Sequence, residues 1–297
     1  MKDLIILGAG PAGITAAVYA ARKRMDFTVI SLDIGGQAAW SGDIENYTGY
    51  QYITGPELAQ KFKEHLDKYE FDLREGVSVK KVEKQSDGFK VILSEGEALL
   101  TKTLVIASGK KPSLLGVPGE GKYKNKGLAY CATCDGPLFA GKNVAVIGGG
   151  NSALDAALQM TKIAAKVYLI NINKELAGDK IMREKVQTAK NVEILNETKT
   201  LEVLGDKFVN AVKVETKGQA REIPVSGIFV EIGLVPNTSF IDFVNKNEQQ
   251  EIMINCKAET SDPAVFAAGD VTDVPEKQII IAAGDGAKAC LSAFRYL

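Results

Sequence analysis

Short apolar runs followed by glycine-rich turns set the pattern of this chain. Residues 3–7 form a run that is apolar after Asp3, residues 8–13 are glycine-rich, and the alanine-rich stretch 14–24 has the composition of a helix. A further apolar run covers residues 27–32. This order predicts a strand, a tight turn, a helix and a second strand, which is the context that a dinucleotide-binding glycine motif requires.

The same pattern occurs again in the second half of the chain. Residues 142–147 predict a strand, residues 148–153 a glycine-rich turn, residues 154–165 a helix and residues 166–171 another strand. The other predicted elements are an amphipathic helix at 55–70, antiparallel strands within 77–93 around a turn at 86–88, strands at 103–109, 208–215 and 228–232, and an alanine-rich helix from about Gln278.

Two proline-containing segments separate the repeated units. Pro112 begins a loose stretch that reaches residue 126, and Pro236 lies in a second crossing at 233–238. We therefore predict an α/β fold of two Rossmann-like three-layer (ββα) dinucleotide-binding domains, with the second inserted into the first. Residues 1–112 and 237–297 would form the first domain and residues 113–236 the second, with Pro112 and Pro236 as hinge candidates.

Composition narrows the class of protein. The chain has 297 residues and a net charge of −1, which provides no basic face for a phosphate backbone, so no nucleic-acid partner is expected. The first residues run directly into the glycine-rich turn without a leader pattern, and no apolar stretch is long enough to span a bilayer. These features predict a cytoplasmic protein without a membrane partner.

Cys131 and Cys134 form a CxxC pair ahead of the second glycine-rich turn. Such a pair cycles between dithiol and disulfide, and the adjacent Asp135 is a candidate for moving the proton that the cycle requires. Aspartate is also a common helix cap, which is the alternative for Asp135. No metal site is predicted, because Cys256 and Cys290 are isolated and are interpreted as packed thiols, and the only histidine lies in a charged helical stretch.

The first glycine motif has a residue for each physical requirement of a dinucleotide site. Gly8 permits the tight turn, Gly10 lets the backbone approach a pyrophosphate, and Gly13 allows close packing of helix and strand. Asp33, twenty residues after Gly13, is placed to bind a ribose hydroxyl. The second motif, at residues 148–150, is either a second nucleotide site or a relic of the fold.

Together these motifs resemble the low-molecular-weight thioredoxin reductase family, class II of the pyridine nucleotide-disulfide oxidoreductases, and also the reductase core of the alkyl hydroperoxide reductase flavoprotein subunit. The resemblance covers the whole chain. It rests on GAGPAG (8–13), GGQ (35–37), CATCDGPLF (131–139), GGGNSA (148–153), FAAGDV (266–271) and QIIIAAGDGAKA (278–289).

The resemblance implies a thioredoxin-disulfide reductase that passes electrons from NAD(P)H through FAD and the dithiol to a protein disulfide. It also implies that Cys134 faces the flavin, Cys131 attacks the partner, Asp135 protonates the departing thiolate, the domains rotate and the chain forms a homodimer. The implied FAD-binding residues are Gly8, Gly10, Pro11, Ala12, Gly13, Asp33, Gly35, Gly36, Gln37, Asn46, Gly109, Asp270, Gln278 and Ile279. The implied NAD(P)H-binding residues are Gly148, Gly149, Gly150, Asn151, Ser152, Asn171 and Lys174. Trp40 either covers the flavin or only packs.

The chain departs from the family where NADPH is recognised. Members that use NADPH carry a His-Arg-Arg cluster, whereas this chain has Asn171-Ile172-Asn173-Lys174. Asn171 could bond ribose hydroxyls and Lys174 could meet a phosphate, and NADH is slightly favoured. A lost nicotinamide site, with ferredoxin or a deazaflavin as donor, is the alternative.

The expected acceptor is a separate protein, either thioredoxin or a thioredoxin/glutaredoxin-like protein. An NADH-dependent reductase that serves a glutaredoxin-like or peroxiredoxin system is the alternative. Two other classes remain open: a flavin electron-transfer reductase or oxidase that does not use the dithiol, and a flavin-binding redox sensor without turnover.

Overall fold

The computed structural model describes residues 1–41 and 43–297 of the chain. It divides into two compact units. The first consists of residues 1–111 and 235–297, and the second of residues 112–234, so the second unit is inserted into the sequence of the first. The two connecting segments, β9 (Lys110–Pro112) and β18 (Leu234–Pro236), pair as a two-stranded sheet.

A mixed sheet forms the centre of the first unit. Its strands follow the order β5-β2-β1-β8-β7-β6, and β19 pairs with the second half of β8. Strands β5, β2, β1, β8 and β19 are mutually parallel, whereas β6, β7 and the start of β8 form an antiparallel meander. The strands are β1 (Lys2–Ala9), β2 (Phe27–Ile34), β5 (Asp72–Glu75), β6 (Val79–Gln85), β7 (Gly88–Leu93), β8 (Ala98–Ile106) and β19 (Val265–Ala267).

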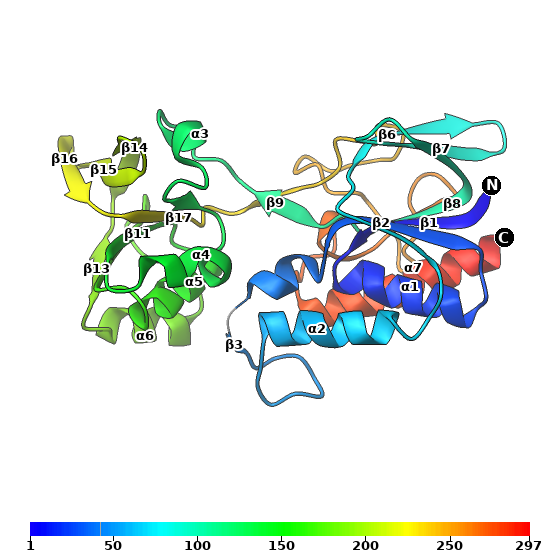
Figure 1. The fold of residues 1–297 in the computed structure, drawn as a ribbon, viewed down its shortest axis with the longest axis horizontal. Helices are drawn as coiled ribbons and strands as arrows, with labels where there is room; N and C mark the ends of the chain where they lie inside the picture. The colour runs from blue at the N-terminus through cyan, green and yellow to red at the C-terminus, as the bar shows by residue number, and fades with distance from the viewer. Residues whose placement is uncertain (42) are drawn as a thin grey trace. The chain divides into compact units, whose positions relative to one another are not determined.

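Three helices cover one side of the parallel strands of this sheet, and the β6–β7 hairpin lies on the other side of those strands (Figure 1). They are α1 (Pro11–Arg22), α2 (Gly55–Leu66) and α7 (Ile279–Tyr296). Helix α2 starts with a capping box in which Thr54 and Glu57 satisfy each other's backbone amides. Helices α1 and α7 pack closely, because a Cβ on Gly286 of α7 would lie only 2.0 Å from the carbonyl oxygen of Ala12.

The second unit repeats the layered arrangement with a parallel sheet in the order β10-β17-β11-β12-β13. Helices α5 and α6 lie on one side of it, and an antiparallel sheet of β14, β15 and β16 lies on the other (Figure 1). The elements are β10 (Leu128–Ala129), β11 (Asn143–Ile147), α5 (Asn151–Thr161), β12 (Lys166–Ile170), α6 (Lys180–Thr188), β13 (Val192–Leu195), β14 (Thr198–Gly205), β15 (Val209–Thr216), β16 (Gln219–Pro224) and β17 (Gly227–Val230).

Short elements complete the two units. In the first they are the 3-10 helices η1 (Gly36–Trp40) and η3 (Gly269–Val271) and the two-residue strands β3 (Asp43–Ile44) and β4 (Ile53–Thr54). In the second they are α3 (Glu120–Tyr123), α4 (Ala132–Asp135) and the 3-10 helix η2 (Gly136–Phe139). Among the described residues, no helix is long and apolar enough to cross a membrane.

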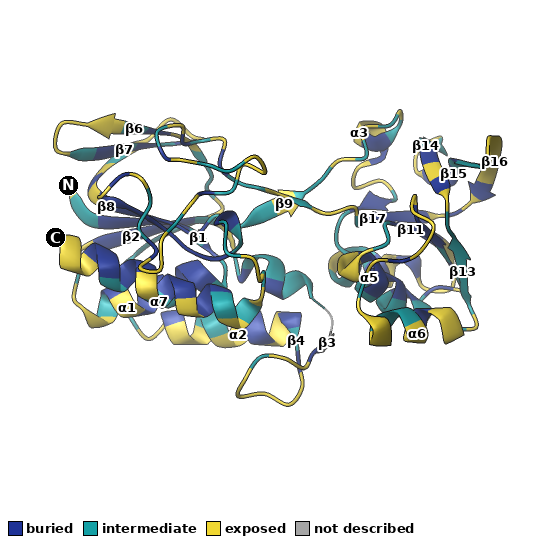
Figure 2. Ribbon diagram, turned by 180° about the vertical axis from the view of Figure 1, so that it is seen from behind, coloured by how far each residue is buried: buried dark blue, intermediate teal, exposed yellow. Residues whose placement is uncertain are grey.

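The central strands are buried on both faces. In β1, Leu4 and Ile6 belong to the core that includes α1 and α7, while Ile5 and Leu7 belong to the core beneath the β6–β7 meander. Strand β11 shows the same alternation between the two cores of the second unit. Side chains of successive strand residues point to opposite faces, so continuous apolar runs are what a sheet covered on both sides requires. Figure 2 shows these buried strands beside helices that are partly exposed.

Candidate active site

The first glycine motif forms a close-packed turn between β1 and α1. Gly8 has φ of +108°, and a Cβ there would lie 2.3 Å from the carbonyl oxygen of Ala107. A Cβ on Gly13 would lie 1.9 Å from the carbonyl oxygen of Gly8. Gly10, in contrast, has open space where a Cβ would be, at the N-cap of α1. The turn is therefore open at the helix N-terminus, where backbone amides favour a pyrophosphate.

Other residues predicted to bind FAD surround this turn. The amide of Gly35 donates to the carbonyl oxygen of Ala9 at 2.7 Å, and the Asp33 carboxylate accepts from the amide of Gly36 at 3.1 Å. A Cβ on Gly36 would lie 3.2 Å from Cα of Gly10. The segment 33–36 thus lies directly beside the first glycine motif.

Two side-chain hydrogen bonds connect further predicted residues. Gln37 Nε2 donates to the carbonyl oxygen of Lys110 at 3.2 Å, next to Gly109. Asn46 Nδ2 donates to Oε1 of Gln278, the N-cap residue of α7, at 3.0 Å. The structure therefore brings these predicted residues together in pairs, although they are far apart in the sequence.

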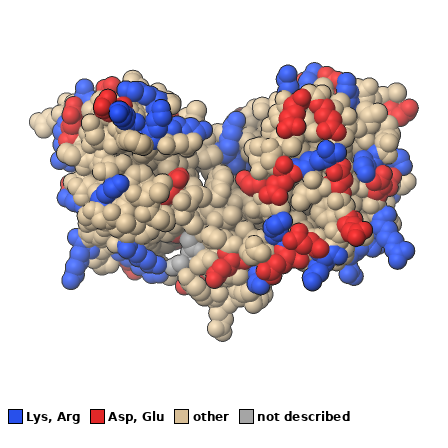
Figure 3. Space-filling model, in the orientation of Figure 1, with Lys and Arg blue, Asp and Glu red and all other residues tan. Residues whose placement is uncertain are grey.

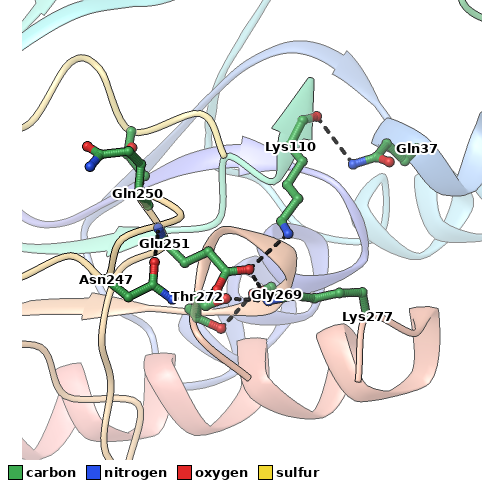
Figure 4. A network of polar contacts seen from close by, with 9 residues as sticks. Gln37, Lys110, Asn247, Gln250, Glu251, Gly269, Thr272 and Lys277 are labelled. Atoms are coloured by element: carbon green, nitrogen blue, oxygen red, sulfur yellow. Dashed lines mark hydrogen bonds and ion pairs between the residues drawn. The ribbon is translucent and has the colours of Figure 1, made fainter. Parts of the chain in front are cut away.

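Asp270 lies in η3, close to a buried group of charges. Burial raises the pKa of its carboxyl, whereas the nearby cations of Lys277 and Lys110 oppose that rise. The two lysines share one carboxylate oxygen of Glu251, at 3.0 Å from Lys277 Nζ and 2.9 Å from Lys110 Nζ (Figure 4). The group thus carries both signs of charge beside the predicted cofactor residues.

The second glycine motif repeats the geometry of the first. Gly148 has φ of +143°, and a Cβ there would lie 2.1 Å from the carbonyl oxygen of Glu231. Gly150, the N-cap of α5, has open space in place of a Cβ. The side chain of Asn151 accepts from the amide of Asp179 at 2.7 Å, and Asn151 and Ser152 are exposed. This turn is also open at a helix N-terminus.

Asn171 and Lys174 have contrasting surroundings. The Asn171 side chain is buried, and its Nδ2 donates to the carbonyl oxygens of Asn173 and Glu175 and to Oδ1 of Asn196. A Cβ on Gly149 would lie 2.4 Å from Asn171 Oδ1. Lys174 is exposed. Asn171 therefore shapes the loop beside the glycine motif, and its binding of a ribose stays a prediction.

Cys131 and Cys134 form a disulfide with a Cα–Cα distance of 5.4 Å. Cys131 is the N-cap of the short helix α4, and its sulfur accepts from the amide of Cys134 at 3.1 Å. A backbone N–H directed at sulfur favours the thiolate when the disulfide is reduced. Cys256 is exposed and Cys290 is buried, and both are free thiols. Burial raises the pKa of the Cys290 thiol to about 12, so it is unreactive.

Asp135 ends the helix that carries the two cysteines. Burial raises the pKa of its carboxyl, which favours the protonated form that an acid catalyst needs. On the other side of the motif, the Tyr130 hydroxyl donates to Glu120 Oε1 at 2.7 Å. Glu120 also accepts from the amides of Leu115 and Gly116, so it anchors the chain that leads into the cysteine motif.

A chain of hydrogen bonds connects the cysteine helix with α5, the helix that follows the second glycine motif. Thr133 Oγ1 donates to Gln159 Oε1 at 2.7 Å, and Gln159 Nε2 donates to Asp155 Oδ2 at 2.7 Å. Both acceptor residues lie on α5. Glu231 follows β17, and burial together with the Asp155 charge raises the pKa of its carboxyl to about 8. The raised pKa favours the neutral form of Glu231 near pH 7.

Sequence analysis did not identify Glu231 or Glu251 as functional residues. Glu231 directly follows a buried parallel strand, where ligand-binding residues of such sheets are concentrated, and that position was the available signal. Glu251 lies outside every motif. Among residues 1–41 and 43–297, no group of histidine, cysteine, aspartate and glutamate side chains could hold a metal ion.

Comparison with known proteins identifies the family to which this chain is related. The sequence model of the pyridine nucleotide-disulphide oxidoreductase family matches residues 2–286. The chain is 42% identical over 298 residues to the F subunit of alkyl hydroperoxide reductase from Staphylococcus aureus (strain MSSA476), and the match covers 99% of this chain and 59% of that protein. The chain thus spans little more than half the length of this relative.

Two solved structures are also similar. Thioredoxin reductase of Lactococcus lactis, in its FR conformation, gives a TM-score of 0.93 at 33% identity, covering 100% of this chain and 99% of that one. Thioredoxin reductase of T. acidophilum gives a TM-score of 0.91 at 37% identity, covering 99% and 98%. The predicted fold class and the resemblance are confirmed.

The name of the matched family indicates a pyridine nucleotide, and the resemblance described above implies FAD as well. Both glycine turns fit such groups, because each combines a position that only glycine can fill with an open N-cap at the start of a helix. The chain therefore belongs to the pyridine nucleotide-disulphide oxidoreductase family.

Proposed function

We propose that this protein is a thioredoxin-disulfide reductase, which uses the Cys131–Cys134 pair to reduce the disulfide of a thioredoxin or thioredoxin-like protein. The disulfide beside a partly buried Asp135 carries this proposal. FAD, when bound, would supply the relay that passes two electrons from the pyridine nucleotide to this disulfide. We assign FAD to the first unit and the pyridine nucleotide to the second.

The chemistry of the two cysteines follows from thiol exchange. Reduction with two electrons and two protons opens the Cys131–Cys134 bond. Cys131 Sγ loses its proton to solvent and, as a thiolate, attacks one sulfur of the partner's disulfide, and the other partner sulfur leaves and takes a proton from Asp135. Cys134 Sγ gives its proton to the Asp135 carboxylate and attacks Cys131 Sγ. This restores the Cys131–Cys134 disulfide and releases the second partner sulfur, which takes a proton from solvent.

The pyridine nucleotide is proposed to be NADH. An arginine pair is absent from the segment that follows β12, where Ile172 and Asn173 stand. The exposed Lys174 offers one point charge, without the bidentate geometry by which arginine holds a phosphate. Other basic side chains of this unit gather along the edge that α6 occupies (Figures 1 and 3), outside the segment 171–174 that directly follows β12.

A second acceptor is favoured by the relatives. The 42% identity to the F subunit of alkyl hydroperoxide reductase suggests a thioredoxin-like protein that feeds a peroxide-reducing system. The same cysteine chemistry would serve it. We propose a separate acceptor protein in either case, a homodimeric enzyme and a cytoplasmic location.

Anaerobic flavin spectroscopy tests this function. Mixing the yellow protein with NADH, and separately with NADPH, should bleach the flavin band faster with NADH. If neither bleaches the band while dithionite does, the donor is ferredoxin or a deazaflavin, and the second glycine motif is structural.

Substitution of the cysteines tests the acceptor step. Cys131→Ser and Cys134→Ser should abolish reduction of thioredoxin while the flavin is still bleached by the nucleotide. Cys256→Ser, at an exposed free thiol, is the matched control and should keep full turnover. A Cys131→Ser variant with undiminished thioredoxin reduction would refute the proposal and favour a flavin oxidase.

A further inference from the structure

Glu251 occupies a position in the first unit to which no function is assigned. It lies in the segment between β18 and β19, which carries no sequence motif and little regular structure. Its side chain is 13% exposed, which is unusual for a carboxylate. Removing a carboxylate from water costs free energy unless the group is paired and hydrogen-bonded. The partners of Glu251 therefore indicate its role.

The two oxygens of the Glu251 carboxylate contact different partners. Oε1 accepts from Lys110 Nζ at 2.9 Å and pairs with Lys277 Nζ at 3.0 Å. Oε2 accepts from Asn247 Nδ2 at 2.7 Å, and the Glu251 amide donates to Asn247 Oδ1 at 2.9 Å. The turn from Asn247 therefore fixes the carboxylate, and the carboxylate fixes two cations (Figure 4).

Both lysines adjoin residues predicted to bind FAD. Lys110 follows Gly109, and its carbonyl oxygen accepts from Gln37 of η1. Lys277 precedes Gln278, the N-cap of α7, and also donates to the carbonyl oxygen of Thr272 next to η3. The Glu251 carboxylate thus connects the segment after β8 with the start of α7, and the backbone of Lys110 connects that segment with the loop after β2.

The balance of charge supports a role toward the cofactor. Lys110 and Lys277 are 14% and 25% exposed, and Asp270 lies within their electrostatic influence. Without Glu251, two largely buried cations would repel each other, and the segments that carry them would separate. A purely local role in folding would not require both lysines to lie in cofactor-binding segments.

We propose that Glu251 is a positioning residue of the FAD site, which holds the segments at Gln37, Lys110 and Lys277 at the spacing that FAD requires. The inference depends on FAD as the cofactor and is independent of the disulfide substrate. Its test measures FAD binding, so a failure of the proposed thioredoxin chemistry would leave the result intact.

The experiment compares FAD dissociation constants and thermal stability of apoproteins. Glu251→Gln keeps the size of the side chain and removes its charge. We expect its FAD dissociation constant to rise by about tenfold or more, the size typical of losing a residue that orients a ligand-binding group. Glu248→Gln changes an exposed carboxylate of the same turn and should leave FAD binding unchanged.

A second variant separates positioning from folding. Lys110→Met removes one cation while the Lys277 contact remains, and its FAD affinity should fall by a smaller factor. In the double variant the two losses should be less than multiplicative, because both act through one contact. If Glu251→Gln does not fold, Lys110→Met alone decides.

Two results would overturn the inference. One is a Glu251→Gln apoprotein with lowered thermal stability and unchanged FAD affinity, which would limit the residue to the fold. The other is unchanged FAD affinity in Lys110→Met. The reduction potential of the bound flavin is an independent readout, since a shifted cofactor senses different charges from Lys110, Lys277 and Asp270.

Discussion

Glu231 offers a direct test of the electrostatics of the second unit. Burial and the nearby Asp155 charge raise the pKa of its carboxyl from 4.5 to about 8. In the unfolded chain the same group ionises near pH 4.5. Between these values the unfolded state releases a proton that the folded state keeps, so stability is lost as the pH rises through this window.

The magnitude follows from the two pKa values. At about 1.4 kcal/mol per pH unit, the gap between 4.5 and 8 corresponds to a loss of about 5 kcal/mol at pH values above 8. Below pH 4.5 the loss vanishes, because both states are protonated. Glu231→Gln removes the ionisation and keeps the shape, so it should be more stable than the wild type by up to about 5 kcal/mol at pH 9 and nearly equal at pH 4.5.

Urea unfolding followed by circular dichroism at the two pH values measures this difference. Glu222→Gln, at an exposed position in β16 of the same unit, is the control and should not show it. Asp155→Asn should make the loss of stability smaller and complete at a lower pH, because removing the negative charge lowers the pKa of Glu231 in the folded state alone. Equal effects of Glu231→Gln at both pH values would refute the reasoning.

Two further predictions concern the nucleotide and the acid. Gly148→Ala places a Cβ 2.1 Å from the carbonyl oxygen of Glu231 at φ of +143°, so we expect a loss of about 1–3 kcal/mol of stability and slower flavin reduction by the nucleotide, with FAD content unchanged. Normal nucleotide titration of this variant would contradict the assigned site. Asp135→Asn should slow thioredoxin reduction by about 10²-fold or more, and it should remove the decline in rate that the wild type shows as the pH rises through the raised pKa of Asp135. An unchanged pH profile would argue for a helix-capping role.

Helices and strands that are marked by a pattern within their own residues were predicted from the sequence. The strand, glycine turn and helix at residues 3–24 correspond to β1 and α1, and the repeat at residues 142–171 corresponds to β11, α5 and β12. Helix α2 ends at Leu66, although helical periodicity was predicted to residue 70. Helix α6 and strand β14 were not predicted. Helix α6 is mostly polar and, among its described residues, buries only Val186, so it lacks the apolar and alanine-rich composition that marked α1 and α5.

The sequence motifs did not predict the hydrogen-bond and ion-pair partners of individual side chains. For Asn171 the sequence indicated that it could bond ribose hydroxyls, which stays a prediction. It did not indicate that Asn171 Nδ2 donates to two loop carbonyls and to Asn196. Glu251 and Lys110 meet across 141 residues of sequence. This contact depends on the path of the irregular segment that contains Glu251, and the spacing of residues in the sequence does not predict that path.

The two units offset the carboxylates near their glycine turns in different ways. Each presents an open helix N-terminus as the proposed site of a dinucleotide, whose pyrophosphate is negative, so each uncompensated carboxylate nearby would weaken binding. In the first unit, Lys110 and Lys277 offset Glu251 and Asp270. In the second, burial keeps Glu231 protonated beside Asp155. Because the first solution uses permanent charges and the second a proton, nucleotide affinity should weaken with rising pH through about 8, while retention of FAD should not.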